Sequence, residues 1–61
     1  NLYKTQKWQR QRERVLRRDE YMCRECKRYG RTAQATTVHH IYPVEQYPEW
    51  KWATWNMLSL C

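Results

Sequence analysis

The sequence predicts a small α+β fold made of an N-terminal basic helix, a zinc knuckle and a two-stranded antiparallel hairpin. Residues 5–20 contain no Gly or Pro and are rich in Gln, Glu and Arg, which favours a helix. A Cys-x-x-Cys pair follows, and residues 36–41 and 57–61 form two short apolar runs. Because a 61-residue chain buries only about 60% of its unfolded surface, we expect a metal or disulfides to support it.

The cysteines indicate metal binding rather than a disulfide scaffold. The chain has three cysteines, an odd number that cannot pair off completely. Its first residues form no apolar signal segment, and no apolar run approaches the length of a membrane span. We therefore expect a soluble, intracellular, cytoplasmic protein with no membrane partner, whose thiols bind metal.

The charge balance points to a polyanionic partner. Twelve Lys and Arg against six Asp and Glu give a formal net charge of +6. Nucleic acid is the default partner for such a chain, and an anionic membrane surface is a weaker alternative. The chain also carries four Trp and five Tyr, which suit either contact with bases and phosphates or a small core.

The expected helix, residues 5–20, has two different sides, with Thr5 as a plausible N-cap. At 100° per residue Trp8, Val15 and Leu16 share the apolar side. A cationic side that lacks acids is predicted to contact phosphates, unless it is only a solvated face. Its members are Lys7, Arg10, Arg14, Arg17 and Arg18. Arg12 and Asp19 fall in the apolar sector, which this two-sided pattern does not explain.

Cys23 and Cys26 have the spacing of two thiolates on one tetrahedral zinc. Gly30 follows and can take the positive φ that turns the chain away. Cys61 could bring a third thiolate to the metal. The redox alternative, a thioredoxin-like Cys-x-x-Cys, needs a βαβ setting for which the chain is too short.

Two adjacent histidines, His39 and His40, lie in the β-favouring run 36–41, which Pro43 ends. One imidazole can hold a divalent cation and the other can accept a proton near neutral pH. A two-Cys, two-His zinc finger is a rival, since twelve residues separate Cys26 from His39. It lacks its fourth ligand and the helix that would carry it, so we reject it.

Residues 42–51 have no periodicity and contain two prolines, which predicts a loop. Trp50, Trp52 and Trp55 follow closely and could stack on bases, although anchoring of the core or the loop is favoured. Asn56 then precedes residues 57–61, which we expect to pair with residues 36–41 as the antiparallel hairpin.

Taken together, these motifs resemble the HNH endonucleases with a ββα-metal active site, in particular the small phage and bacterial kind with two Cys-x-x-Cys pairs. The resemblance covers most of the chain, as a single domain over residues 1–61 with a basic helical arm at 1–20 and a knuckle and hairpin core at 21–61. The matching residues are Val15-Leu16-Arg17-Arg18-Asp19, Cys23 and Cys26, Val38-His39-His40-Ile41 with Pro43, and Asn56 with Leu58, Leu60 and Cys61.

The resemblance implies a nuclease that hydrolyses DNA phosphodiesters with one divalent cation (Mg, Mn, Ni or Zn) beside a separate structural zinc. Position by position, His39 matches the first metal ligand and His40 the general base that activates water. Asn56 matches the residue whose amide bonds backbone and braces the loop between the strands. The family continues with a second cysteine, a histidine and the helix that carries them, so we expect the chain to be truncated at Cys61 and poor at chemistry by itself.

Two other classes remain open. One of the histidines could complete the zinc site beside Cys23, Cys26 and Cys61, which would make a basic zinc module that binds nucleic acid without cutting it. A packaging accessory that acts with a phage terminase is a further alternative, raised only by the phage resemblance. Because an arginine-rich helix reads backbone rather than bases, low sequence specificity is expected.

Overall fold

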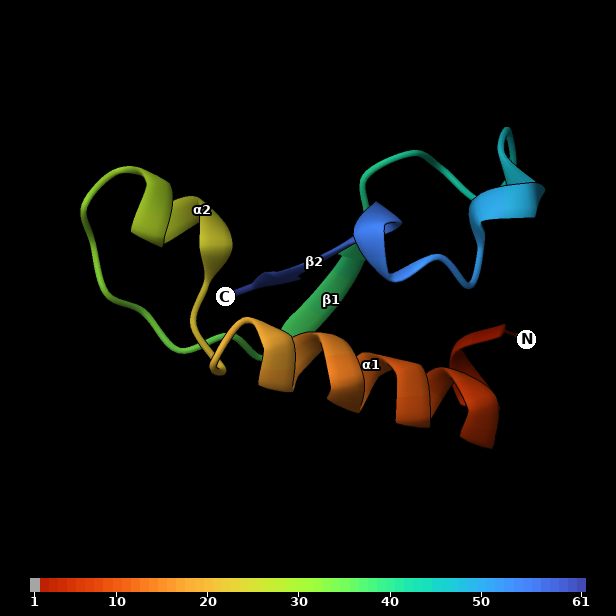
Figure 1. The fold of residues 1–61 in the computed structure, drawn as a ribbon, viewed down its shortest axis with the longest axis horizontal. Coiled ribbons are helices and arrows are strands. Elements are labelled where there is room, and N and C mark those ends of the chain that lie inside the picture. The colour runs from red at the N-terminus through yellow and green to blue at the C-terminus, as the bar shows by residue number, and fades with distance from the viewer. Residues whose placement is uncertain (1) are drawn as a thin grey trace.

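The computed structural model describes residues 2–61 as two helices and a two-stranded antiparallel sheet (Figure 1). Helix α1 spans Gln6–Arg18 and helix α2 spans Arg24–Arg28. The strands are β1, Thr37–His40, and β2, Met57–Leu60. Short 3-10 turns occupy Leu2–Lys4, Pro48–Trp50 and Thr54–Asn56. Helix α1 crosses one face of the hairpin, and α2 lies near the end of the hairpin at which β2 finishes (Figure 1). The small α+β fold predicted from the sequence is confirmed.

Helix α1 begins as the sequence indicates and ends two residues earlier than expected. The Thr5 hydroxyl accepts a hydrogen bond from the Trp8 amide at 3.1 Å, as an N-cap does. The helix was expected to reach Glu20, but Glu20 and Tyr21 adopt left-handed φ angles of 56° and 58°. This reversal lets the Tyr21 amide bond back to the Leu16 carbonyl at 2.8 Å, which closes the helix end.

The core lies between α1 and the hairpin. Trp8, Val15 and Leu16 are buried, as predicted for the apolar side of the helix. They pack with Ala35, Val38 and Met57, and Trp52 lies against the edge of this cluster. Since α1 supplies half of these core positions, this helix is an integral part of the fold.

The hairpin register pairs Val38 with Ser59, His39 with Leu58 and His40 with Met57. Val38, Ser59 and Met57 are buried, so these positions face α1 together with half-buried His40. His39 points to the opposite, exposed side. Both strands are slightly shorter than the apolar runs that predicted them: β1 leaves out Thr36 and Ile41, and β2 leaves out Cys61.

The zinc knuckle contains the short helix α2, which was not expected. Cys23 caps it, since its sulfur accepts a hydrogen bond from the Cys26 amide at 3.4 Å. Gly30 has a φ of +76°, which confirms the predicted turn. An isolated bridge between Met22 and Gln34 ties the knuckle to the segment that leads into β1.

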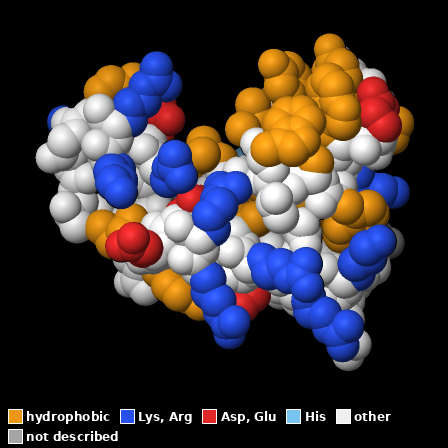
Figure 2. Space-filling view, in the orientation of Figure 1, with side chains coloured by type: hydrophobic (Ala, Val, Ile, Leu, Met, Phe, Trp, Pro, Cys, Tyr) orange, Lys and Arg blue, Asp and Glu red, His pale blue; other side chains and the backbone are white. Residues whose placement is uncertain are grey.

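The connection between β1 and β2 gathers aromatic rings on its surface. Figure 2 shows hydrophobic side chains massed at the upper right, over this connection. Four of these rings contact one another, and Tyr47 and Trp50 stack at 4.7 Å. They are Tyr42, Tyr47, Trp50 and Trp55. Trp52 packs on the core, as anchoring of the fold predicts.

Within residues 2–61, no helix is both long and apolar enough to cross a bilayer.

Candidate metal centre and active site

The three cysteines converge on one point. Their sulfur atoms lie within 4.8 Å of one another, although Cys61 is far from the other two in sequence. The sulfurs of Cys26 and Cys61 are 3.8 Å apart. Tetrahedral zinc with bonds of about 2.3 Å to sulfur separates its thiolates by about 3.8 Å, so the cluster fits a zinc site. The third thiolate predicted at Cys61 is therefore in place.

The thiols in this cluster perturb one another. The backbone N–H of Cys26 donates to the Cys23 sulfur and, together with contacts from Cys61, lowers the pKa of Cys23 to about 7. The neighbouring Cys23 and Cys61 sulfurs raise the pKa of Cys26 to about 11. Cys23 therefore loses its proton readily, whereas the neighbouring sulfurs oppose deprotonation of Cys26. A bound cation would remove that opposition, because coordination favours all the sulfurs in their deprotonated state.

The rival interpretations of the cysteines find no support in this geometry. All three cysteines are free thiols. In residues 2–61 the sheet has two antiparallel strands, so a thioredoxin-like βαβ setting is absent there. The metal-ligating group found in the same residues consists of the three cysteines alone, without His39 or His40. Neither a zinc finger nor a histidine-completed zinc site matches this arrangement.

The two histidines line one hollow of about 350 Å³ at the end of β1. Tyr3 closes it on the side of the N-terminal turn, and Pro43, Val44 and Glu45 line it from the connection after β1. The imidazoles leave the strand on opposite faces, as strand geometry requires. They reach the same hollow because β1 ends at His40 and the following residues curl around that end.

His40 is held from two sides. Its Nε2 lies 3.0 Å from the Lys51 carbonyl oxygen. Its ring lies 5.3 Å from the Trp8 ring, centroid to centroid, and the Tyr3 ring is near at 6.5 Å. Since a carbonyl oxygen can only accept, the Nε2 that faces it carries the proton of the neutral ring. The other nitrogen, Nδ1, is then left as the proton acceptor.

Asn56 is buried at the junction where β2 begins. Its Oδ1 accepts from the Tyr42 amide at 2.8 Å, and its Nδ2 donates to the carbonyls of Tyr42 and Trp50 at 3.2 Å each. The Asn56 carbonyl also accepts from the Ile41 amide at 2.8 Å. One residue thus ties together both ends of the connection that follows His40.

All five cations predicted to contact phosphate are exposed on α1: Lys7, Arg10, Arg14, Arg17 and Arg18. Figure 2 shows Lys and Arg side chains along the lower edge of the molecule, over α1, and again over α2. Lys7 lies over the Trp52 ring at 4.3 Å, and Arg17 pairs with Glu13 at 3.4 Å. The structure brings these cations together on one side of the helix, away from the cysteine cluster.

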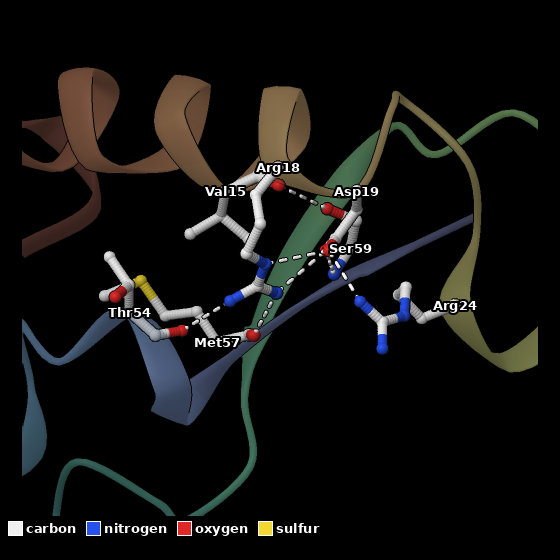
Figure 3. A network of polar contacts seen from close by, with 7 residues as sticks. All are labelled: Val15, Arg18, Asp19, Arg24, Thr54, Met57 and Ser59. Atoms are coloured by element: carbon white, nitrogen blue, oxygen red, sulfur yellow. Dashed lines mark hydrogen bonds and ion pairs between the residues drawn. The ribbon is translucent and has the colours of Figure 1, made fainter.

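Arg18 is placed differently from the other four. Its guanidinium pairs with the Asp19 carboxylate through two hydrogen bonds of 2.8 and 2.9 Å. It also donates to the carbonyl oxygens of Thr54 and Met57, both at 2.8 Å. Figure 3 shows it pointing from α1 toward the start of β2. We therefore leave Arg18 out of the candidate phosphate-contact surface.

Sequence reasoning missed the roles of Asp19 and Arg12. Asp19 is buried and accepts hydrogen bonds from Arg18, Arg24 and the Ser59 amide. Burial by itself would raise the pKa of Asp19, but these donors outweigh it and hold the pKa well below its ordinary value. Arg12 donates to the Thr36 carbonyl at 2.7 Å. The available signal was their place in the apolar sector of the helix, where a charged residue needs an internal partner.

Comparison with known proteins identifies the fold. Among solved structures the chain matches the crystal structure of the HNH endonuclease of the deep-sea thermophilic bacteriophage GVE2, determined with manganese ion. The match has a TM-score of 0.92 at 32% sequence identity, and covers 97% of this chain and 64% of that one. This chain therefore spans less than two thirds of the length of its relative. No family model matches it, nor does any curated protein.

The structural match defines a small α+β protein with the fold of the HNH endonucleases, and the cysteine cluster fits a metal site. The resemblance indicated by the sequence motifs is confirmed, and this chain has the HNH endonuclease fold. The match is to a phage endonuclease determined with manganese ion. It gives no support for a packaging partner.

Proposed function

We propose that this chain is the DNA-cleaving domain of a metal-dependent HNH endonuclease, which hydrolyses phosphodiester bonds. The observation that carries the proposal is the hollow that both histidines line, with His40 held by the Lys51 carbonyl. The relative from bacteriophage GVE2, an HNH endonuclease, supports the same class of activity.

His40 is the proposed general base. Its Nδ1 accepts a proton from a water molecule in the hollow, while Nε2–H stays bonded to the Lys51 carbonyl. The activated water then forms a new bond to phosphorus, and the bond to the leaving sugar oxygen breaks. Trp8 and Tyr3 keep the imidazole from rotating away from this position.

His39 is the proposed ligand for a divalent cation, which in such nucleases neutralises charge on the phosphate. An exposed imidazole suits several transition metals and the carboxylate of Glu45 lines the same hollow. Within residues 2–61, however, the cysteine cluster is the only group of three or more convergent ligands. The described residues therefore give this cation an incomplete protein ligand set. Magnesium, manganese, nickel and zinc are all candidates.

The structural metal is proposed to be zinc, held by Cys23, Cys26 and Cys61. DNA is the proposed substrate, bound through the exposed cations of α1. These side chains would contact phosphates rather than bases, so cleavage should depend little on sequence. The proposed phosphate-contact residues are Lys7, Arg10, Arg14 and Arg17.

The proposal is tested by incubating supercoiled plasmid with the full-length protein and Mg²⁺ or Mn²⁺. Nicked or linear product that disappears with chelator is the expected result. DNA binding in a gel-shift assay without cleavage in any divalent ion would instead support the basic, non-catalytic zinc module. Counting metals separates the two further, since the nuclease should bind one tightly held zinc and a second, exchangeable cation.

A further inference from the structure

A continuous set of polar contacts runs from the zinc knuckle to the connection behind His40. It starts at Arg24, the first residue of α2, whose Nη1 is 2.8 Å from Asp19 Oδ1. The Asp19 carboxylate then holds Arg18, and Arg18 holds the carbonyls of Thr54 and Met57 (Figure 3). These are the residues two before and one after Asn56.

Asn56 carries the contacts onward. Its backbone lies between the two carbonyls that Arg18 holds, and its side chain binds the Tyr42 amide and carbonyl. Tyr42 is two residues after His40, in the bend that comes directly before the lining residues Pro43, Val44 and Glu45. Any shift of the Thr54–Asn56 turn would therefore be passed to the chain that leaves His40.

The geometry favours an internal role for the Arg18 side chain over a phosphate contact. Three of its nitrogens, Nε, Nη1 and Nη2, are already engaged by oxygen atoms of this chain at 2.8–2.9 Å. Its charge is balanced by a carboxylate with no exposed surface. Releasing the guanidinium to DNA would leave the buried Asp19 carboxylate without its two-bond partner, which is costly.

We propose that Arg18, held by Asp19, is a positioning residue for the active site: it fixes the turn before β2 and, through Asn56, the backbone that follows His40. The planar fork of the guanidinium is what the role requires, because it reaches a carboxylate and two carbonyls at once. Lysine keeps the charge but offers a single point donor. The effect on catalysis rests on the proposed nuclease function, whereas the effect on the backbone does not.

The test is Arg18→Lys in the full-length protein, with Arg31→Lys as the matched control at an exposed position. We expect the single-turnover cleavage rate at saturating DNA to fall roughly tenfold or more, because the reacting groups lose their alignment. DNA affinity and its salt dependence should stay unchanged. Amide hydrogen exchange at Tyr42 should accelerate, while exchange in the middle of α1 stays slow. Arg31→Lys should alter none of these.

Hydrogen exchange keeps the inference distinct from the proposed function. If the parent cuts no DNA, faster exchange at Tyr42 in Arg18→Lys still supports the positioning role. Asp19→Asn provides a second variant, which should reproduce the effect with Arg18 intact. Unchanged exchange at Tyr42 in both variants would overturn the inference. So would an Arg18→Lys protein that keeps its saturating cleavage rate and loses about one unit of salt slope, as a phosphate contact would.

Discussion

At the level of single side chains, Asn56 shows how a buried amide can organise a loop. Its oxygen and nitrogen together make three hydrogen bonds to backbone groups of Tyr42 and Trp50, and the residue has no exposed surface. Buried polar groups are tolerated only when such partners are present. The amide is specific here, because the site requires an acceptor and a donor at neighbouring atoms.

Replacing Asn56 by Asp tests this requirement with almost no change of shape. The carboxylate keeps the acceptor for the Tyr42 amide and loses the donor to two carbonyls. The Tyr42 carbonyl is then left unpaired, whereas the Trp50 carbonyl keeps its bond from the Ala53 amide at 3.2 Å. Since each unsatisfied buried group costs about 1–3 kcal/mol, we expect a loss of unfolding free energy in this range or above it. Urea denaturation measures it, with exposed Gln46→Glu as the control for the same chemical change. Equal stability of the two variants would contradict this description of the site.

Single residues were predictable from sequence where their role is local. Thr5 caps the helix that follows it, and Gly30 turns the chain beside its own knuckle. Arg18 was expected to contact phosphate, and its contacts to Thr54 and Met57 were not foreseen. Those partners lie far along the sequence, where helical periodicity carries no information.

At the level of elements, α1 joins the core on one side and presents cations on the other. Lys7 contacts the Trp52 ring and Arg17 pairs with Glu13, whereas Arg10 and Arg14 are exposed, so their proposed role is electrostatic. Each phosphate neutralised by such a side chain releases a condensed counterion, which makes DNA affinity fall with salt.

We predict that Arg10→Gln combined with Arg14→Gln weakens DNA binding at all sequences alike. The slope of log affinity against log salt should decrease by about 2, one for each lost phosphate contact. Fluorescence anisotropy across a salt series measures the slope. A protein with Arg31→Gln, which removes a cation away from α1, serves for comparison. If the double substitution leaves the salt slope of DNA affinity unchanged, Arg10 and Arg14 contact only solvent and not phosphate.

Asp19 joins α1, α2 and β2, and it predicts how stability depends on pH. Its pKa is held below the unfolded value of about 3.9 by Arg18, Ser59 and Arg24 against the opposing effect of burial. The unfolded chain therefore binds more protons at acid pH, and the stabilisation is complete above about pH 5 and lost progressively below it. Asp19→Asn should flatten this acid limb relative to the parent.

Urea midpoints between pH 6 and pH 2.5 measure the effect of Asp19→Asn. The variant is also expected to lose at most about 3–5 kcal/mol of unfolding free energy at neutral pH, because the paired arginines lose their charged partner. Glu25→Gln, an exposed acid on α2, should keep the acid limb of the parent. An acid limb that is identical in Asp19→Asn and the parent would remove Asp19 as its source.

The elements themselves were predictable to different degrees. The helix and the two strands have clear patterns, and their register follows from burying Val38 and Met57 on the side of α1. Helix α2 is only five residues long, and its sequence of charged residues around a cysteine has no apolar side. The end of α1 was also missed, because left-handed φ angles at Glu20 and Tyr21 are imposed by the bonds that close the turn.

For the whole molecule, a small core would leave much of the stability to the proposed zinc. The core cluster holds six buried apolar residues, and the cysteine cluster joins the knuckle to the end of β2. Removing a metal held by these cysteines would release the knuckle from the end of β2. In small domains of this kind the free energy of metal binding is largely free energy of folding.

We therefore predict that a strong chelator unfolds the protein or greatly lowers its thermal midpoint, as measured by circular dichroism. Calcium-saturated chelator is the control for effects other than metal removal. Cys61→Ser should weaken binding of Co²⁺, followed by its thiolate absorption, because one of three sulfur ligands is lost. If the chelator leaves the fold unchanged and Cys61→Ser leaves the Co²⁺ spectrum unchanged, the cysteine cluster is excluded as a structural metal site.

The most direct measurement is the single-turnover rate of DNA cleavage by His40→Ala, with DNA affinity determined on the same protein. If His40 is the base, the rate should fall by roughly 10²–10⁴-fold while affinity and fold are kept. Gln46→Ala, in the same connection and outside the hollow's lining residues, should cut as fast as the parent. A His40→Ala protein that cleaves at the parent's rate would contradict the assignment of this imidazole, and with it the proposed mechanism.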